Sequence, residues 1–194
     1  MSATSATLLA RLRNRTDTEA WRRLVDLYTP LLSGWLRRYA LQASDADDLV
    51  QEVLAAVVRE LPHFEHSGRV GAFRHWLRTI LVNRLREFWR ANRIRPAAAG
   101  GSDFAQMLDQ LADPDSGLSQ LWDQEHDQHV ARRLLAMIEP QFAPSTWQAF
   151  RRVVLDGARP DAVAEELGLT LNAVFIAKSR VLQRLRQEAR DLLD

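Results

Sequence analysis

The sequence predicts an all-α protein made of two small helical domains joined by an acidic linker. Apolar residues recur at intervals of three and four along almost the whole chain, and no run alternates strictly for long enough to form a strand. At residues 96–104 the composition changes to PAAAGGSDF, which is typical of a linker. We therefore expect a first domain over residues 1–95, a linker over 96–126 and a second domain over 127–194.

The first domain is expected to contain three helices. The first runs from about Asp17 to Leu41, with a kink at Pro30. The second begins with Ser44 as its N-cap and continues to Pro62, with aspartates in its first turn. The third covers residues 72–92, with apolar side chains on one side and arginines on the other.

Later segments are also predicted to be helical. Phe104, Met107, Leu108 and Leu111 have the spacing of a short helix within the linker. Further helices are expected at about 119–139, 144–156 and 160–167, the last between Pro160 at its first position and Gly168 just past its end. A turn, GLT, then leads into the closing helix.

The composition excludes several classes of protein. The chain has no cysteine, so it has neither disulfides nor thiolate metal sites, and a reducing cytoplasm fits best. Only His126 and His129, near Asp123 and Asp127, could place two metal ligands on one helical turn, and a polar surface helix gives the same spacing. The apolar run at 54–58 is far shorter than the ~20 residues of a membrane span. We expect a cytoplasmic protein with no cofactor, metal or membrane insertion.

Charge is segregated along the chain, although the formal net charge is only +1. Residues 61–96 hold eight arginines against two glutamates, whereas residues 97–131 hold seven acids and neither lysine nor arginine. This arrangement indicates a surface that binds a polyanion, followed by a segment that the polyanion repels or that mimics it.

Three segments could carry function. The closing helix has Val174, Ala177, Val181 and Leu185 on one face and polar side chains opposite, as in a helix-turn-helix or an ordinary helical hairpin. The basic helix has Trp76 and Trp89 beside its arginines, either to stack on unpaired bases or to fill the core. The helix at 44–61 has an acidic face for docking or solvation, and the absence of a nearby nucleophile or histidine argues against an enzyme.

These segments together resemble the sigma-70 family of transcription initiation factors. DADDLVQEVLAAVVREL and the pattern from Phe64 to Arg86 resemble region 2 of the family, and AVAEELGLTLNAVFIAKSRVLQRLR resembles region 4. With only these two regions and a linker, the chain is similar to the extracytoplasmic-function class of bacterial sigma factors. The resemblance implies a non-catalytic subunit that binds core RNA polymerase and reads promoter DNA.

The resemblance also implies roles for individual residues. The acidic helix would dock on the clamp helices of the beta-prime subunit, with a further polymerase contact at the beta flap, while the linker would thread a basic channel. The residues for clamp docking are Asp45, Asp48, Gln51 and Glu52. Those for the melted minus-10 strand are Phe64, Phe73, His75, Trp76, Arg78, Asn83, Arg86 and Arg90. Those for the minus-35 duplex are Thr170, Asn172, Phe175, Ile176, Ser179, Arg180 and Arg184.

Two features depart from the family pattern. The loop between Phe64 and Phe73 is a few residues longer, and Phe175 and Ile176 stand where the family commonly has a lysine or arginine followed by serine. Reading of the minus-35 element would therefore rely more on apolar contact and DNA shape. An anti-sigma factor is a further partner that the resemblance allows. A different hypothesis is a stand-alone helix-turn-helix regulator whose N-terminal domain senses a ligand or dimerises.

Overall fold

The protein is all-α, as predicted. The computed structural model describes residues 7–14, 16–38, 41–65, 67, 69–92, 101–190 and 192, apart from the side chains of residues 92 and 101–104. These residues form helices and connecting turns, with no strand among them. The chain divides into two compact units, the first reaching Val130 and the second running from Ala131 to Arg190. None of the helices in the described part is long and apolar enough to cross a membrane.

The first unit begins with α1 (Leu8–Leu12) and α2 (Thr18–Leu36). Asp17 caps α2, because its carboxylate accepts the backbone N–H of Ala20 at 3.0 Å. The helix continues through Pro30 and ends earlier than the predicted Leu41. Its apolar face is buried, with Leu24, Tyr28 and Trp35 almost without exposed surface.

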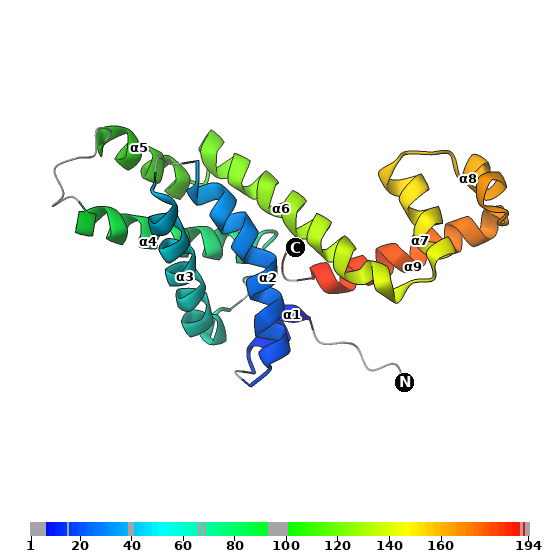
Figure 1. Ribbon diagram of the computed structural model, residues 1–194, viewed down its shortest axis with the longest axis horizontal. Coiled ribbons are helices and arrows are strands. Elements are labelled where there is room, and N and C mark those ends of the chain that lie inside the picture. The colour runs from blue at the N-terminus through cyan, green and yellow to red at the C-terminus, as the bar shows by residue number, and fades with distance from the viewer. Residues whose placement is uncertain are drawn as a thin grey trace. The chain divides into compact units, whose positions relative to one another are not determined.

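The next helix, α3 (Ala43–Glu60), packs against both α2 and α4 (Figure 1). Its start corrects the predicted N-cap, because Ser44 lies inside the helix and Gln42 is the cap. Gln42 caps through its backbone: its carbonyl accepts the N–H of Ala46 at 3.0 Å, and no side chain bonds to the helix start. A 3₁₀ turn, Leu61–His63, contains Pro62 and follows directly.

The basic helix α4 (Ala72–Asn92) has the predicted bounds. Its apolar face joins the core of the first unit, since Phe73, Leu77 and Leu85 are buried. The following helix, α5 (Gly101–Ala112), packs against α4 (Figure 1). The next, α6 (Gly117–Ile138), places Trp122 edge-on to Trp35 of α2, with 5.0 Å between ring centroids.

Most of the segment predicted to be a linker is therefore a folded part of the first unit in the structure. Its described part, 101–126, is almost entirely helical and belongs to the first unit, and the units divide at Val130 instead of near residue 126. The physical reason is apolar burial, because Leu108, Leu111 and Trp122 are fully or almost fully enclosed. The acidic composition of the segment did not indicate that its apolar residues would be buried.

The second unit contains the end of α6, a 3₁₀ turn (Glu139–Gln141), α7 (Pro144–Phe150) continued by a π-helical turn (Arg151–Leu155), α8 (Pro160–Leu167) and α9 (Leu171–Ala189). Its core lies where α7 and α8 pack on α9, around Ala149, Val163 and Val174. Gly168 ends α8 with a φ of +63°, a conformation that favours glycine. Thr170 then caps α9 by accepting the N–H of Ala173 at 3.1 Å.

Candidate nucleic-acid interface

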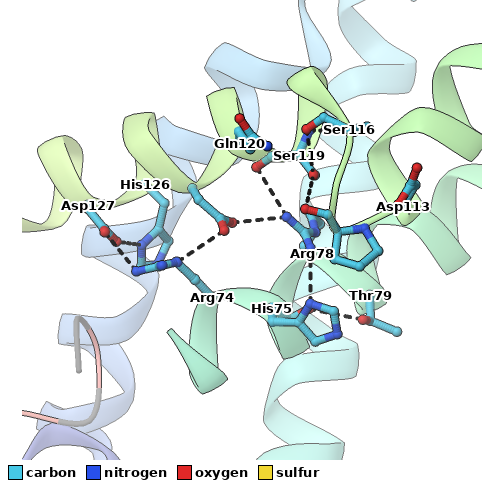
Figure 2. Close-up of polar contacts among 12 residues, drawn as sticks. Arg74, His75, Arg78, Thr79, Asp113, Ser116, Ser119, Gln120, His126 and Asp127 are labelled. Atoms are coloured by element: carbon cyan, nitrogen blue, oxygen red, sulfur yellow. Dashed lines mark hydrogen bonds and ion pairs between the residues drawn. The ribbon is translucent and has the colours of Figure 1, made fainter. Parts of the chain in front are cut away.

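The polar side chains of α4 divide between two sides of the helix. An α-helix turns 100° per residue, so Arg74 and Arg78 share one side, about a third of a turn away from a second row of polar residues. Both arginines point toward α6 (Figure 2). The second row is exposed or half-buried and consists of His75, Thr79, Asn83, Arg86 and Arg90.

Arg78 is almost completely enclosed, with 3% of its surface exposed. One guanidinium nitrogen donates to the Asp123 carboxylate at 3.0 Å and to the Ser119 carbonyl at 3.2 Å. The other donates to Nδ1 of His75 at 3.0 Å (Figure 2). Burial lowers the pKa of Arg78, while the charge of Asp123 opposes that effect. In this arrangement Arg78, although predicted to bind the minus-10 strand, is inaccessible to DNA.

Acids from α5 and α6 also hold neighbouring arginines. Arg74 lies 3.4 Å from Asp123 and 2.8 Å from Asp127, so Asp123 bridges Arg74 and Arg78. At the other end of α4, Arg86 pairs with Asp109 of α5 at 3.1 Å, in a more exposed contact. Three acids, two from the predicted linker and Asp127 directly after it, therefore pair with three arginines of the basic helix.

His126 anchors the same part of α6 in the core. Its Nδ1–H donates to Asp127 at 3.0 Å, because a carboxylate only accepts, and Nε2 accepts the Tyr28 hydroxyl at 3.2 Å. Burial lowers the pKa of His126, and burial raises the pKa of Tyr28 well above its ordinary value. His129 donates from Nε2 to the Leu27 carbonyl at 2.7 Å. Both histidines considered as metal ligands thus contact α2, and the described residues hold no cluster of three or more metal-ligating side chains.

Aromatic rings join the loop before α4 to its first turn. Phe64 lies 4.9 Å from Trp76 and 5.8 Å from Phe73, measured between ring centroids. Phe73 is fully buried, whereas Phe64 and Trp76 are half-buried. Phe73 is therefore a core residue here, and Phe64 and Trp76 are the rings of this cluster that reach the surface.

A small cavity of about 120 Å³ opens between α4 and the end of α5. Its lining includes four of the residues predicted to bind the minus-10 strand, together with apolar residues from both helices. The lining residues are His75, Arg78, Thr79, Val82, Asn83, Arg86, Leu111 and Ala112. A recess lined by both polar and apolar side chains thus adjoins the exposed row of α4.

The acidic face of α3 lies at the surface. Asp48, Gln51 and Glu52 are exposed and Asp45 is half-buried, while the opposite face of the helix is buried against α2 and α4. The four residues predicted for polymerase docking therefore share one face of a helix whose other face is packed in the core.

Some of the predicted contact residues of α9 have exposed side chains, whereas others are already bonded within the protein. Phe175 and Ile176 are 48% and 42% exposed, and Asn172, Ser179 and Arg180 are also exposed. Arg184 is half-buried, pairs with Glu188 and donates to Gln141 at 2.9 Å. The Thr170 hydroxyl is used as the helix cap. The exposed part of this face therefore carries both apolar and polar side chains.

Sequence reasoning missed the acids that contact α4, namely Asp109, Asp123 and Asp127. The acidic block following the basic block was the available signal, but charge segregation does not specify which residues pair. The contact between Asp123 and Arg78 joins positions 45 residues apart, and helical periodicity carries no information at that separation.

Comparison with known proteins places residues 24–94 in the family model of sigma-70 region 2. This match lies entirely within the first unit and includes α3 and α4. The chain is also 28% identical over 113 residues to the RNA polymerase sigma factor NccH of Alcaligenes xylosoxydans xylosoxydans. That alignment covers 57% of this chain and 59% of the relative, so the chain spans about three fifths of the length of that relative.

Proposed function

Because the chain belongs to the sigma-70 family through its region 2, we propose that it is an RNA polymerase sigma factor of the extracytoplasmic-function class. It would bind core polymerase and direct initiation at promoters that carry minus-10 and minus-35 elements. The observation that carries this proposal is the presence, in one chain, of region 2 and of a second unit whose last two helices form a helix-turn-helix with an exposed outer face. On this proposal the chain has no catalytic residues.

The polymerase would dock on the acidic face of α3. Asp48 and Glu52 are one helical turn apart and exposed, so their carboxylates are available to a basic partner such as the beta-prime clamp helices. Gln51 and Asp45 extend the same face. The buried side of α3 fixes the orientation of this surface on the unit.

The minus-10 strand would lie along the exposed row of α4. Asn83 can hydrogen-bond to bases or backbone, while Arg86 and Arg90 supply positive charge for phosphates. Phe64 and Trp76 offer partly open aromatic surfaces at the N-terminal end of the helix, where an unpaired base could stack.

The minus-35 duplex would be read by α9. Its exposed face combines Asn172 and Ser179, which can reach base edges, with Phe175 and Ile176, which can contact thymine methyl groups. Arg180 would pair with phosphate. The N-terminal half of α9 would enter the major groove, as in other helix-turn-helix proteins.

Core binding tests the proposal. Replacing Asp48 and Glu52 by arginine should abolish binding to core polymerase and transcription from selected promoters, with an unchanged helical circular dichroism spectrum, because both side chains are exposed. Glu19→Arg with Asp26→Arg is the matched control, since these acids are exposed on α2 and give the same change in charge. Unchanged affinity of the first variant would refute the docking role. Tight, specific binding to duplex DNA without polymerase would favour a stand-alone regulator.

A further inference from the structure

Acids of α5 and α6 contact arginines of α4 that would otherwise be available to phosphate groups. We propose that Asp109, Asp123 and Asp127 form an intramolecular acidic cover, which competes with single-stranded nucleic acid for the arginines of α4 in the free protein. This inference rests on the proposed function, because it assumes that α4 binds nucleic acid. The acidic cover consists of these three residues together with the helices that carry them.

The geometry of the inner contact supports mimicry of a phosphate backbone. Two carboxylates face two guanidiniums, with Asp123 between Arg74 and Arg78 and Asp127 on Arg74 alone. Arginine binds carboxylate and phosphate oxygens through the same set of N–H donors, so one anion can replace the other. Both arginines are largely shielded from water, with side-chain exposures of 16% and 3%, so their charges need anionic partners in either state.

The outer contact is weaker. Arg86 and Asp109 form an exposed pair, with side-chain exposures of 42% and 77%. An exposed pair of this kind contributes little to stability, because solvent screens the two charges. Nucleic acid could therefore displace Asp109 first and reach the exposed row of α4, while Asp123 and Asp127 still hold the inner arginines.

Apolar contacts hold the acidic cover in place. Trp122 packs on Trp35, and His126 is hydrogen-bonded to Tyr28, so the cover is fastened to α2 as well as to α4. On its outer edge Arg38, in the turn after α2, lies 2.9 Å from Glu125 of α6. Access to Arg74 and Arg78 therefore requires movement of α6, and a bond across this edge would prevent that movement.

The first experiment weakens the cover in the full-length protein. Asp123→Asn with Asp127→Asn should bind a fluorescent single-stranded DNA of roughly 20 nucleotides about tenfold more tightly than the unmodified chain at low salt, because two arginines lose their internal anions. The matched control is Asp26→Asn with Asp115→Asn, which gives the same change in net charge at exposed positions away from the inner contact. Equal affinity of the two double variants would overturn the proposal.

A crosslink provides the opposite test and does not depend on removing charge. The chain has no cysteine, so Arg38→Cys with Glu125→Cys can be joined specifically by a reducible bismaleimide. The crosslinked form should bind the same DNA about tenfold more weakly than the same double-cysteine chain before crosslinking, and reduction should restore binding to the level of the uncrosslinked chain. Crosslinking that leaves affinity unchanged would overturn the proposal, even if the aspartate variants unfold.

Arg90→Ala separates this inference from the proposed function. Arg90 lies on the exposed row of α4 and outside the acidic cover. If α4 binds DNA, Arg90→Ala weakens binding by both the opened variant and its charge control. If the proposed function fails, no variant binds the DNA through α4 and Arg90→Ala has no effect, which also overturns the cover. If only the cover fails, Arg90→Ala weakens binding but opening and crosslinking do not change it.

Discussion

The two helices proposed to contact DNA, α4 and α9, present their polar faces in opposite ways. Arg74 and Arg78 of α4 lie beneath α6, where Asp123 bridges them. The outer face of α9 is open, and two of its large apolar side chains are exposed beside the polar ones. A basic helix is therefore not automatically a free surface for anions. Whether the arginines of such a helix are available depends on whether the following segment of the chain supplies acids that pair with them.

The two helices also differ in how far the residues that stabilise the fold overlap with those of the candidate interface. On α4, paired charges and an aromatic contact stabilise the first unit, so the candidate interface and the core share residues. On α9, Val174 and Val181 face the core while Phe175 and Ile176 face outward, so the residues that pack and the residues proposed to contact DNA are separate. Substitutions should therefore affect stability and binding together on the α4 side, and separately on α9.

The largest effect is expected from Trp122→Ala. Removing a fully buried tryptophan should lower the free energy of unfolding by about 3–5 kcal/mol, because it leaves a cavity against Trp35. Hydrogen exchange should become faster in α6 and α5, while the core of α9 around Val174 keeps its protection, since it is built from other residues. Urea denaturation followed by circular dichroism measures the loss.

Leu121→Ala is the control for this change, because Leu121 is adjacent and 41% exposed. Its effect on unfolding should stay within about 0.5 kcal/mol. Equal losses for the two variants would show that α6 is not fastened through Trp122, and the contrast between a covered α4 and an open α9 would then lose its structural basis.

Periodicity and capping residues were enough to predict much of the fold. The bounds of α4 follow from a regular apolar stripe, and those of α8 from Pro160 and Gly168, which restrict the chain locally. The start of α3 could not be predicted from its sequence, because the backbone of Gln42 caps the helix and Ser44 suggested a side-chain cap. Helix bounds were therefore predictable where residues of the helix or directly beside it set them.

The candidate site was predictable only in part. The exposures of Asp48, Asn83 and Ile176 follow from helical position, and the structure places all three at the surface. The enclosure of Arg78 does not, because it depends on α6 folding back onto α4. A long-range contact of this kind comes from the burial of Trp122 and its neighbours, not from the charge pattern that the sequence displays.

A smaller effect is expected on the α9 side. Phe175→Asp with Ile176→Asp should weaken binding to duplex fragments selected from a random-sequence library by about 2 kcal/mol, because apolar contact is lost and negative charge faces the DNA. The free energy of unfolding should change by less than about 0.5 kcal/mol, since both side chains are exposed. Fluorescence anisotropy with the full chain at low salt measures the affinity.

Val154→Asp with Leu155→Asp is the control, because these residues are exposed apolar neighbours in the same unit but outside α9. The control adds the same charge and should bind the selected duplex more tightly than the α9 variant does. If the two variants bind equally, general charge repulsion explains the loss, and α9 has no special part in reading duplex DNA.

The smallest effect is expected from acidification, and it concerns only the first unit, where α6 covers α4. His126 is surrounded by Tyr28, Asp127, Asp123 and Arg74, and burial lowers its pKa below the ordinary value of 6.5. The unfolded chain then binds the proton more readily than the folded chain, so stability decreases as the pH falls through 6.5 and below. At about pH 6 the loss from this residue is at most about 0.8 kcal/mol.

The measurement is the free energy of unfolding by urea between about pH 7.5 and 5.5, for the native chain and for His126→Gln. Glutamine can still hydrogen-bond but does not titrate in this range, so the variant should be less stable at neutral pH and should lose part of the decline on acidification. Hydrogen exchange should locate the acid-sensitive part of the decline in α6, with α9 unaffected. Parallel pH profiles for the two chains would mean that His126 does not supply the pH dependence, and that the acidic cover is held by contacts insensitive to its protonation.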